Sequence, residues 1–451
     1  MSDATTYLFY QSRNPRPFLD RGEGIYLFDE DGKRYIDGSS GAMVSNIGHS
    51  NPRVLAKMKA QMDRATFGYR LHFRTHPSED LAAKTVALTP EGLDRVFFVS
   101  GGSEAVESAV KLARQYALTQ GETGRYRVIS RFPSYHGCTF GALDLTGYDP
   151  LREPFAPMMP GMPKVPSPAS YLDRDNLTEE ERGLKYAGLL RDKILAEGPS
   201  NVLAFIMEPV GGASTGALVA PDSYYGRIRE ICDEFGVLLI YDEVMTGAGR
   251  TGKFLAAEHW GITPDIVALS KGFGAGYAPL GAIVAGARLV EPVLDAGGFL
   301  HGFTYAGNPL ACSAGLAVLE EMEEQGLIEN AAKMGDVLMA QLHALMERYP
   351  FIGDVRGKGL LTAFEFVSDR ETMSPLPVAL DAHARLVELA YERGLIIYSR
   401  RTRGGTAGDH FLLAPPLIIT AEQIAEMMTI LRDALDAFAH ETGLPILEED
   451  S

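Results

Sequence analysis

The middle of the chain alternates short apolar runs with longer amphipathic stretches, and this alternation limits the fold more than any other feature. The runs are apolar throughout, which is typical of strands buried on both faces of a parallel sheet. The stretches between them have helical periodicity. Together they predict an α/β fold: a large domain with a mostly parallel central sheet flanked by helices. The expected strands are Arg95–Ser100, Phe205–Pro209, Val237–Glu243, Ile266–Lys271 and Gly281–Ala285.

The two ends of the chain have a different pattern. In Gly24–Gly38, two apolar runs flank the turn dipeptide Asp-Gly, which predicts a β-hairpin. Past residue 310 a helical stretch is followed by strand-like pieces and a last helix. We therefore predict an N-terminal segment, 1–60, that packs with a smaller α+β domain, 321–451, while 61–320 forms the large domain.

Two local signals refine this outline. The last helix is expected to begin at Thr420, because Gln423 follows three residues later as in a capping box. Seven prolines crowd the stretch Pro150–Pro168. Such a stretch is expected to be an irregular insertion, either a surface loop or the rim of an active site.

The charge and the cysteines limit the partners and the compartment. The net charge is −17, from 59 acidic and 42 basic residues, so we expect neither nucleic acid nor an anionic membrane as a partner. No apolar stretch approaches the ~20 residues of a membrane span, and 1–10 lacks the pattern of a secretory signal. The chain has three cysteines, Cys138, Cys232 and Cys312. They are too sparse for a disulfide framework, which predicts a cytoplasmic protein. Their spacing is not that of metal ligands, so we expect no metal site.

Open α/β sheets bind ligands at the carboxyl ends of their strands, and four features lie there. The first is VSGGSEAVESAVK, where a strand ends at Ser100, Gly101 and Gly102 form a turn, and a helix begins at Ser103. Small residues before the free N–H groups of a helix start are suited to hold a phosphate. A glycine turn followed by a serine N-cap explains the same residues without a ligand.

The other three features are polar groups beside strand ends. Asp242 and Glu243 follow the strand VLLIY, either partly exposed or aimed at a cationic group. Lys271 ends another strand, either reaching solvent or serving as a nucleophile whose amine has lost its hydration. Tyr135 and His136 occupy a turn, where an aromatic ring packs locally or stacks on a flat ligand.

Taken together, these features match the needs of pyridoxal 5′-phosphate. The amine of Lys271 can form a Schiff base with its aldehyde. The carboxylate of Asp242 can pair with the pyridine nitrogen and keep it protonated, so that the ring accepts electrons. The helix start would hold the phosphate.

The whole chain resembles the class III aminotransferases, the ω-amino acid branch of the fold type I pyridoxal-phosphate enzymes. The shared motifs follow one another over nearly the full length. They are GIYLFDEDGKRYIDGSSG, NIGHSNP, FVSGGSEAVESAVKLAR, SYHG, IMEPVGG, YDEVMTGAGRTG, PDIVALSKG, HGFTYAGNPLACSAGLAVL, VRGKGL and GDHFLLAPPLIIT.

The resemblance implies roles for the residues that match these motifs. Lys271 is implied as the catalytic Schiff-base lysine, and Asp242 as the partner of the pyridine nitrogen. Val244 and Tyr135 are implied to lie against opposite faces of the ring.

Further implied roles concern the phosphate, the substrate and the assembly. Gly102 and Ser103 are implied to hold the phosphate. Glu208 is implied to lie near the phenolic side of the ring and to pair with a mobile arginine. Thr304 resembles a threonine that reaches the phosphate of the neighbouring subunit, which implies a homodimer with shared active sites.

The chain departs from the family pattern in its substrate region. Met245 stands where many members that use ω-amino acids have glutamine. The segment before Gly408-Asp409 is longer than usual, so several arginines compete for the substrate carboxylate, and an exposed basic loop is the alternative. These arginines are Arg400, Arg401 and Arg403. Met43 and Phe67–Phe73 stand at positions that shape the substrate pocket in the family, and ordinary packing is the alternative role for them.

These features predict a transaminase that moves an amino group from an amine or ω-amino acid to a 2-oxo acid, either pyruvate or 2-oxoglutarate. Lys271 would then shuttle a proton between the substrate carbon and the cofactor. A racemase, an aminomutase or a decarboxylase on the same fold is one alternative, and these need no 2-oxo acid. A non-catalytic phosphate- or nucleotide-binding protein is the other, and it would have no need of Lys271 or Asp242.

Overall fold

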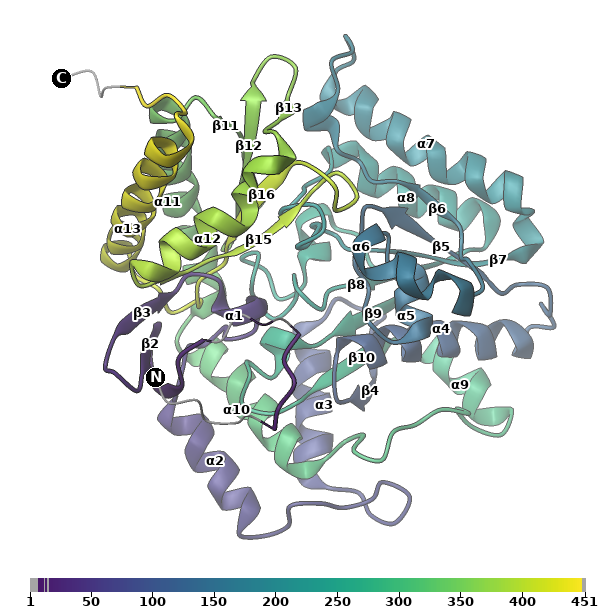
Figure 1. The fold of residues 1–451 in the computed structure, drawn as a ribbon. Helices are drawn as coiled ribbons and strands as arrows, with labels where there is room; N and C mark the ends of the chain where they lie inside the picture. The colour runs from purple at the N-terminus through teal and green to yellow at the C-terminus, as the bar shows by residue number, and fades with distance from the viewer. Residues whose placement is uncertain (1–6, 12, 14–15, 448–451) are drawn as a thin grey trace.

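The computed structural model describes residues 7–11, 13 and 16–447, and a seven-stranded sheet lies at its centre (Figure 1). β10 runs antiparallel to both of its neighbours, and every other adjacent pair is parallel, so the predicted mostly parallel sheet is confirmed. In spatial order the strands are β4 (Arg95–Val99), β10 (Gly281–Ala285), β9 (Ile266–Leu269), β8 (Leu238–Asp242), β7 (Val202–Met207), β5 (Arg127–Phe132) and β6 (Lys164–Pro166).

Helices cover both faces of this sheet. Successive side chains of a strand point to opposite faces, so Ile240 packs in one hydrophobic cluster and Leu239 and Tyr241 in the other. The first cluster holds α4 (Gly102–Thr119), α5 (Phe140–Leu145) and α9 (Ala287–Asp295). The second holds α3 (His76–Leu88), α7 (Glu179–Glu197), α8 (Asp222–Phe235) and α10 (Pro309–Glu324).

Two local predictions need correction. Arg95–Ser100 was expected to be fully buried, but β4 is an edge strand and its first residues are partly exposed. The proline-rich stretch is more regular than expected: it forms α6 (Asp149–Arg152), the 3₁₀ helix η1 (Glu153–Met158) and the edge strand β6. A sheet edge tolerates Pro166 because no further strand needs its missing N–H.

The N-terminal and C-terminal segments share a second sheet. The predicted hairpin is confirmed as β2 (Tyr26–Asp29) and β3 (Arg34–Asp37), which pair antiparallel, and β3 pairs with a strand from the far end of the chain. The full order is β1 (Leu19–Glu23), β2, β3 and β14 (Leu395–Ile396). The N-terminal strands therefore join the C-terminal part, while the boundaries at 60 and 320 stay a prediction.

A third, antiparallel sheet belongs to the C-terminal part. Its strands are β11 (Ile352–Lys358), β12 (Leu361–Asp369), β16 (Asp409–Leu413) and β15 (Tyr398–Arg401), with β13 (Ser374–Pro375) beside β12. The predicted last helix is α13 (Ala421–Thr442), and its capping box between Thr420 and Gln423 is present. The remaining α-helices of the described residues are α1 (Ser40–Met43), α2 (Pro52–Met62), α11 (Leu327–Arg348) and α12 (Ala382–Glu392).

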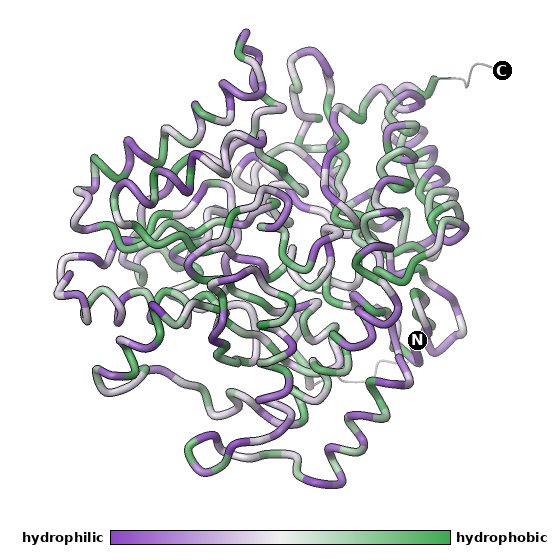
Figure 2. The backbone as a smooth tube through the Cα atoms, turned by 180° about the vertical axis from the view of Figure 1, so that it is seen from behind, coloured by the Kyte–Doolittle hydropathy of each residue, from purple (hydrophilic) through white to green (hydrophobic). Residues whose placement is uncertain are grey.

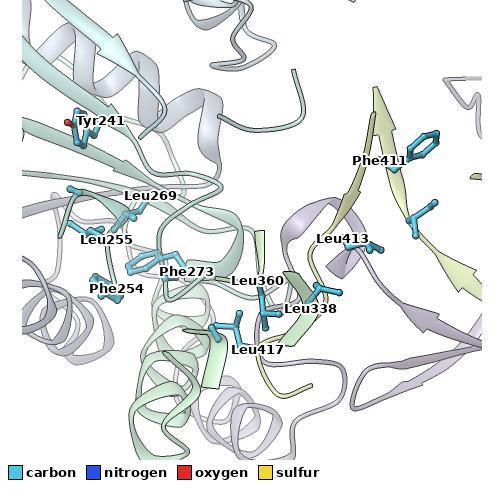
Figure 3. Packing of buried hydrophobic residues seen from close by; sticks show 14 of the residues in the cluster. Tyr241, Phe254, Leu255, Leu269, Phe273, Leu338, Leu360, Phe411, Leu413 and Leu417 are labelled. Carbon is cyan, nitrogen blue, oxygen red and sulfur yellow. The ribbon is translucent and has the colours of Figure 1, made fainter. Parts of the chain in front are cut away.

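The core is continuous between the central sheet and the C-terminal part. Apolar stretches run through the inner strands, whereas the outer helices alternate in hydropathy along their length (Figure 2). Figure 3 shows one cluster that extends from Tyr241 and Leu269 near the central sheet, through Leu360, to Phe411 on β16. The two parts therefore pack as one body around their contact.

A fully buried arginine ties together the segments that surround the strand ends. Arg250 donates to the backbone oxygens of Leu360 at 3.1 Å and Pro415 at 2.5 Å, and to Asn46 Oδ1 at 2.7 Å. Burial lowers its pKa to about 9, with Asp37 opposing the shift. The N-terminal segment and the C-terminal part are thus bonded to one side chain of the large domain.

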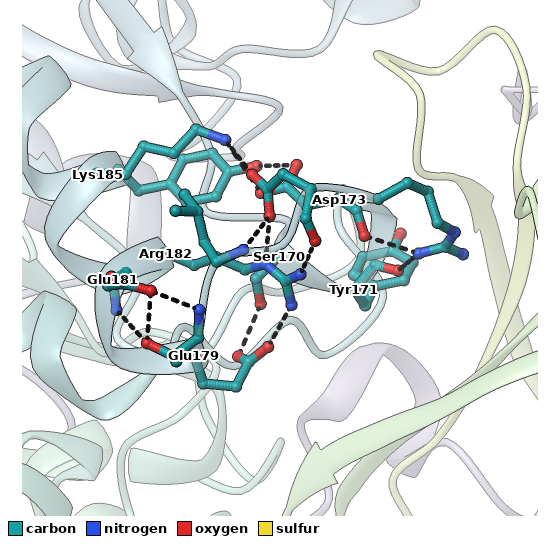
Figure 4. A network of polar contacts seen from close by, with 12 residues as sticks. Ser170, Tyr171, Asp173, Glu179, Glu181, Arg182 and Lys185 are labelled. Carbon is teal, nitrogen blue, oxygen red and sulfur yellow. Dashed lines mark hydrogen bonds and ion pairs between the residues drawn. The ribbon is translucent and has the colours of Figure 1, made fainter.

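A polar network fixes the start of α7 (Figure 4). Thr178 and Glu181 form a capping box, and Arg182 pairs with Asp175 and Glu179. This network holds the segment that precedes α7, which includes Tyr171. Within the described part of the chain, no helix combines the length and apolar character needed to cross a membrane.

Candidate active site

A cavity of about 500 Å³ opens where β8, β9 and the start of α4 meet. Its position at the carboxyl ends of parallel strands is the one expected for a ligand site. Seven of the eight predicted site residues line it. They are Gly102, Ser103, Tyr135, Glu208, Asp242, Val244 and Lys271. Thr304 does not line this cavity and is exposed.

Lys271 lies two residues after the end of β9, in a backbone conformation that few lysines adopt. Its φ is 47°, and its carbonyl accepts from the N–H groups of Gly274 at 3.0 Å and Ala275 at 2.9 Å. Burial lowers the pKa of its ammonium group, and the carboxylates of Asp242 and Glu208 oppose the shift. A lysine amine of lowered pKa is a better nucleophile at neutral pH.

Asp242 is held in place by a histidine at the end of β8. One oxygen lies 2.8 Å from Nδ1 of His136, and the other accepts from the N–H of Val244 at 3.1 Å. His136 is buried, and its Nε2 has no partner among the described residues. The sequence marked His136 only as a turn residue, so its bond to Asp242 was missed.

Glu243, the neighbour of Asp242, points away from the cavity. Its carboxylate accepts from the backbone N–H groups of Ala256 at 2.9 Å and Ala257 at 2.8 Å and from the hydroxyl of Thr246. Burial raises its pKa to about 7, against these hydrogen bonds. Of the two strand-end acids, only Asp242 can meet a ligand in the cavity.

The start of α4 forms a cradle of backbone N–H groups. Gly101 is the N-cap, and no side chain caps the helix, so the predicted alternative of a serine N-cap is wrong. The hydroxyl of Ser103 instead accepts from the N–H of Cys138 at 3.0 Å. A Cβ on Gly137 would lie 2.6 Å from that hydroxyl, so the turn packs against the helix start as closely as glycine allows.

Glu208 follows β7 on another side of the cavity. Its Oε1 accepts from the N–H of Gly212 at 3.1 Å, and its Oε2 lies 3.9 Å from Nη2 of Arg131. Burial raises the pKa of its carboxyl group, while His136 and Arg131 lower it. The same arginine donates to the backbone oxygen of Glu208 at 2.5 Å, so the carboxyl group is held firmly at the cavity wall.

The three candidate arginines lie in different surroundings. Arg400 lines the cavity, with its guanidinium carbon 5.0 Å from the ring centroid of Tyr398. Arg401 instead pairs with Asp409 at 3.0 Å and with Asp381 at 3.1 Å. Arg403 donates to the backbone oxygen of Met373 at 2.9 Å. Only Arg400 of the three is brought to the cavity.

The remaining substrate-region predictions divide in the same way. Met43 and Met245 line the cavity, whereas none of Phe67–Phe73 does. From the proline-rich stretch, Leu151 and Phe155 line it, which confirms that stretch as part of the rim. These side chains give the cavity walls that are apolar except at a few polar points.

A model of the aminotransferase class-III family matches residues 9–435. The chain belongs to this family. It is 34% identical to the putrescine–pyruvate aminotransferase of Pseudomonas aeruginosa over 426 residues, which cover 93% of this chain and 91% of that protein. The recognition made from the sequence motifs is therefore confirmed.

Solved structures of transaminases have the same fold. An (S)-enantioselective ω-transaminase from Thermomicrobium roseum is 36% identical, with a TM-score of 0.90 over 96% of each chain. The ω-transaminase of Pseudomonas jessenii in complex with PMP is 33% identical, with a TM-score of 0.89 over 98% of this chain and 97% of that one. This class-III aminotransferase is an enzyme that transfers an amino group from an amine or ω-amino acid to a 2-oxo acid, with pyridoxal phosphate as cofactor.

The residues around the cavity fit this cofactor. The uncapped first turn of α4 offers N–H groups for a phosphate. A Cβ on Gly102 would lie 2.8 Å from Val244 Cγ1, so only glycine leaves room between the helix start and that side chain. The amine of Lys271 and the carboxylate of Asp242 line the same cavity, and they are the donor and acceptor that an aldehyde and a pyridine nitrogen require.

Proposed function

We propose that this aminotransferase uses pyruvate as its amino acceptor and binds the pyruvate carboxylate with Arg400. One observation carries the proposal: among the described residues that line the cavity, Arg400 is the only arginine or lysine besides Lys271. Pyruvate has one carboxylate to neutralise, whereas 2-oxoglutarate has two. A second buried carboxylate without a cationic partner would be costly to bind.

The surroundings of Arg400 support this assignment. No hydrogen bond or ion pair with a carboxylate of the described residues occupies its guanidinium group, which lies over the ring of Tyr398. A planar guanidinium can accept a carboxylate through two parallel hydrogen bonds. The apolar walls contributed by Met43, Met245 and Phe155 suit the methyl group of pyruvate and the apolar part of an amine donor.

The proposal gives a role to each of the seven predicted site residues that line the cavity. Bound in this cavity, pyridoxal phosphate supplies an aldehyde that captures amines and a ring that accepts the electrons of the substrate's Cα–H bond. The free amine of Lys271 would take the proton from Cα and deliver it to the cofactor carbon that carried the aldehyde. Asp242, oriented by His136, holds a proton on the ring nitrogen. The remaining residues hold the cofactor: Gly102, Ser103, Tyr135, Val244 and Glu208.

The name of one relative agrees with the choice of acceptor. The putrescine–pyruvate aminotransferase of Pseudomonas aeruginosa pairs an amine donor that lacks a carboxylate with pyruvate. We infer the same pairing for this chain, with a terminal amine as donor. The exposed, free thiol of Cys138 and the buried, free thiols of Cys232 and Cys312 suit the cytoplasm, which we propose as the location.

We also propose that the enzyme works as a homodimer with shared active sites. Thr304 lies in an exposed stretch between Leu300 and Tyr305, which are 76% and 63% exposed. Phe67 packs on Tyr305 with ring centroids 6.0 Å apart, and Phe67–Phe73 adds further exposed apolar side chains. Exposed apolar patches of this kind mark interfaces. A sedimentation experiment that gave the mass of one chain at micromolar concentration would contradict the dimer.

The acceptor half-reaction tests the role of Arg400. The holoenzyme is first converted to its aminated form with an amine, and its absorbance is then followed as pyruvate or propanal is added. Propanal resembles pyruvate in size but has no carboxylate. Arg400→Gln should raise the half-saturating pyruvate concentration about tenfold to a hundredfold and change that of propanal less than about twofold.

The neighbouring arginine supplies a matched control. Arg401→Gln removes a guanidinium group that pairs outside the cavity, so it should leave the preference for pyruvate over propanal unchanged. Equal losses with both acceptors in Arg400→Gln would contradict the proposal. So would a wild-type enzyme that saturates with 2-oxoglutarate as readily as with pyruvate.

A further inference from the structure

A buried glutamate that does not line the cavity is bonded to three segments of the chain, two of which lead to residues that do line it. Glu365, on β12, has no exposed surface. Its Oε2 accepts from Tyr171 Oη at 2.8 Å and from Arg356 Nη2 at 2.8 Å. Its Oε1 accepts from Thr402 Oγ1 at 3.1 Å and lies 3.7 Å from Arg403 Nη2. Every oxygen of this carboxylate is therefore committed to a donor.

One of these donors, Arg356, forms a first arm of contacts, which leads from Glu365 to a loop that lines the cavity. Its Nε donates to the carbonyl of Gly216 at 2.7 Å and its Nη2 to the carbonyl of Thr215 at 3.1 Å. Ala213 and Ser214, in the same loop, line the cavity. We call Gly212–Gly216 the 212–216 loop. Its position depends on a guanidinium group that Glu365 in turn holds.

The 212–216 loop fits closely against the C-terminal part. Gly216 has a φ of 63°, and a Cβ there would lie 2.7 Å from Arg356 Nη2 and 2.8 Å from His410 Cδ2. The Arg356 guanidinium group therefore has no free space to move into on the side of Gly216. Because packed groups of this kind shift together, a change at Glu365 reaches the cavity wall.

The second arm leads from Glu365 to Arg400. Thr402 donates its hydroxyl to Glu365, and its N–H donates to the carbonyl of Gly408 at 2.8 Å. Thr402 follows directly on β15, two residues after Arg400. The end of the strand that carries Arg400 is thus bonded to the same carboxylate as the 212–216 loop.

The strand register places Glu365 and Arg400 on one face of the sheet. Glu365 pairs with His410 on β16, and His410 pairs with Arg400 on β15. Directly opposed residues of antiparallel strands point to the same face. His410 is fully buried between them, and burial, with the nearby Arg356 and Arg400, lowers its pKa, so a neutral ring separates Glu365 from Arg400.

We propose that Glu365 is a positioning residue that sets the distance between Arg400 and the 212–216 loop, and so sets the enzyme's preference for acceptors with a carboxylate. The proposal rests on the role of Arg400 proposed above. The ionised carboxylate is needed because its four neighbours are all donors. An amide at this position would turn an N–H₂ group toward some of them and release at least one arm.

Glu365→Gln keeps the size of the side chain and tests the charge. In the acceptor half-reaction of the holoenzyme, the half-saturating pyruvate concentration should rise about tenfold, while that of propanal changes less than about twofold. The limiting rate should stay within about threefold of wild type, because Lys271 and Asp242 are not displaced. A loss shared equally by both acceptors would overturn the proposal.

Two further variants keep the test decisive. Asp354→Asn removes the other carboxylate that pairs with Arg356, at 2.6 Å from Nη1, and leaves Thr402 and Glu365 in contact. It should leave the pyruvate-to-propanal ratio unchanged, and an equal shift there would overturn the assignment to Glu365. Where Glu365→Gln does not fold, Thr402→Val removes one bond to Glu365 and should shift the same ratio in the same direction. An unchanged ratio in that variant would also overturn the proposal.

The two single variants separate the two proposals, and a double variant tests whether they are coupled. If Arg400→Gln alone does not change the ratio, the assigned role of Arg400 fails, and this inference fails with it. If Arg400→Gln changes the ratio and Glu365→Gln does not, only the role of Glu365 fails. If both are correct, Arg400→Gln/Glu365→Gln should show no more loss of pyruvate preference than Arg400→Gln, because Glu365 acts through Arg400. Additive losses would contradict that coupling.

Discussion

Replacing Gly102 with alanine tests the space between the start of α4 and the cavity wall. A Cβ at this position would lie 2.8 Å from Val244 Cγ1 and 3.2 Å from Cγ2. The backbone of Gly102 does not have a positive φ, so alanine itself is not strained there. Gly101 gives a matched control, because a Cβ on that residue would meet nothing within 4 Å.

The size of the effect depends on where Val244 can move. A methyl group forced into a packed contact costs about 1–3 kcal/mol. Alanine in place of glycine also lowers the entropy of the unfolded chain, which stabilises by about 0.4–1 kcal/mol and offsets much of any cost to the apoenzyme. Val244 lines the cavity in which the cofactor belongs, so a shift of its side chain disturbs that space. The cost should therefore appear in cofactor binding, as a loss of about five- to 150-fold in affinity.

Cofactor titration of the apoenzyme, followed by absorbance, measures this loss. Gly102→Ala should bind pyridoxal phosphate more weakly, and Gly101→Ala should bind it like wild type. Adding Val244→Ala to Gly102→Ala removes the two methyl groups that are in the way, and should cost less than the sum of the two single variants. Equal affinity in Gly102→Ala and Gly101→Ala would refute the steric argument.

Two further predictions concern stability. Burial lowers the pKa of the Lys271 amine, so the wild-type apoenzyme is destabilised at any pH at which that amine is protonated. The stability recovers as the pH rises toward 10.5, the ordinary pKa of a lysine. Lys271→Met should therefore raise the unfolding temperature by about 1–3 °C at pH 7, and its difference from wild type should shrink toward pH 10. A difference that grew with pH would be contrary to this reasoning. Thr420→Ala removes the cap of α13 and should cost about 1 kcal/mol in denaturant unfolding without changing kcat, whereas Thr429→Ala on the exposed part of the same helix should not destabilise.

The sequence predicted the elements whose signals are local. The apolar runs of the central strands, the Asp-Gly hairpin and the capping box at Thr420 all depend on neighbouring residues, and each is confirmed. The edge position of β4 and the strand β6 were missed because strand order depends on pairing between distant segments. A proline-rich stretch gives no periodic signal, although β6 needs only three residues to join the sheet.

In the candidate site, too, the residues with a local signal were predicted and the contacts between distant segments were missed. Lys271 and Asp242 stood out because each ends an apolar strand, and strand ends meet at one edge of a parallel sheet. The bond between His136 and Asp242 joins residues 106 positions apart, and nothing in the sequence pairs them. The same holds for the bonds from Glu365 to Thr402 and Arg356, which form only once β11, β12 and β15 are assembled.

The three arginines of the segment before Gly408 show how a single structural fact resolves what a motif leaves open. Arg400 and Arg401 are neighbours on β15, and neighbours on a strand point to opposite faces. Arg400 pairs in register with His410 and lies over the cavity, so Arg401 must turn to the other side, where Asp409 and Asp381 neutralise it. Arg403 lies beyond the strand end. The strand face, rather than proximity to a motif, therefore selects the guanidinium group that is left to meet a substrate carboxylate.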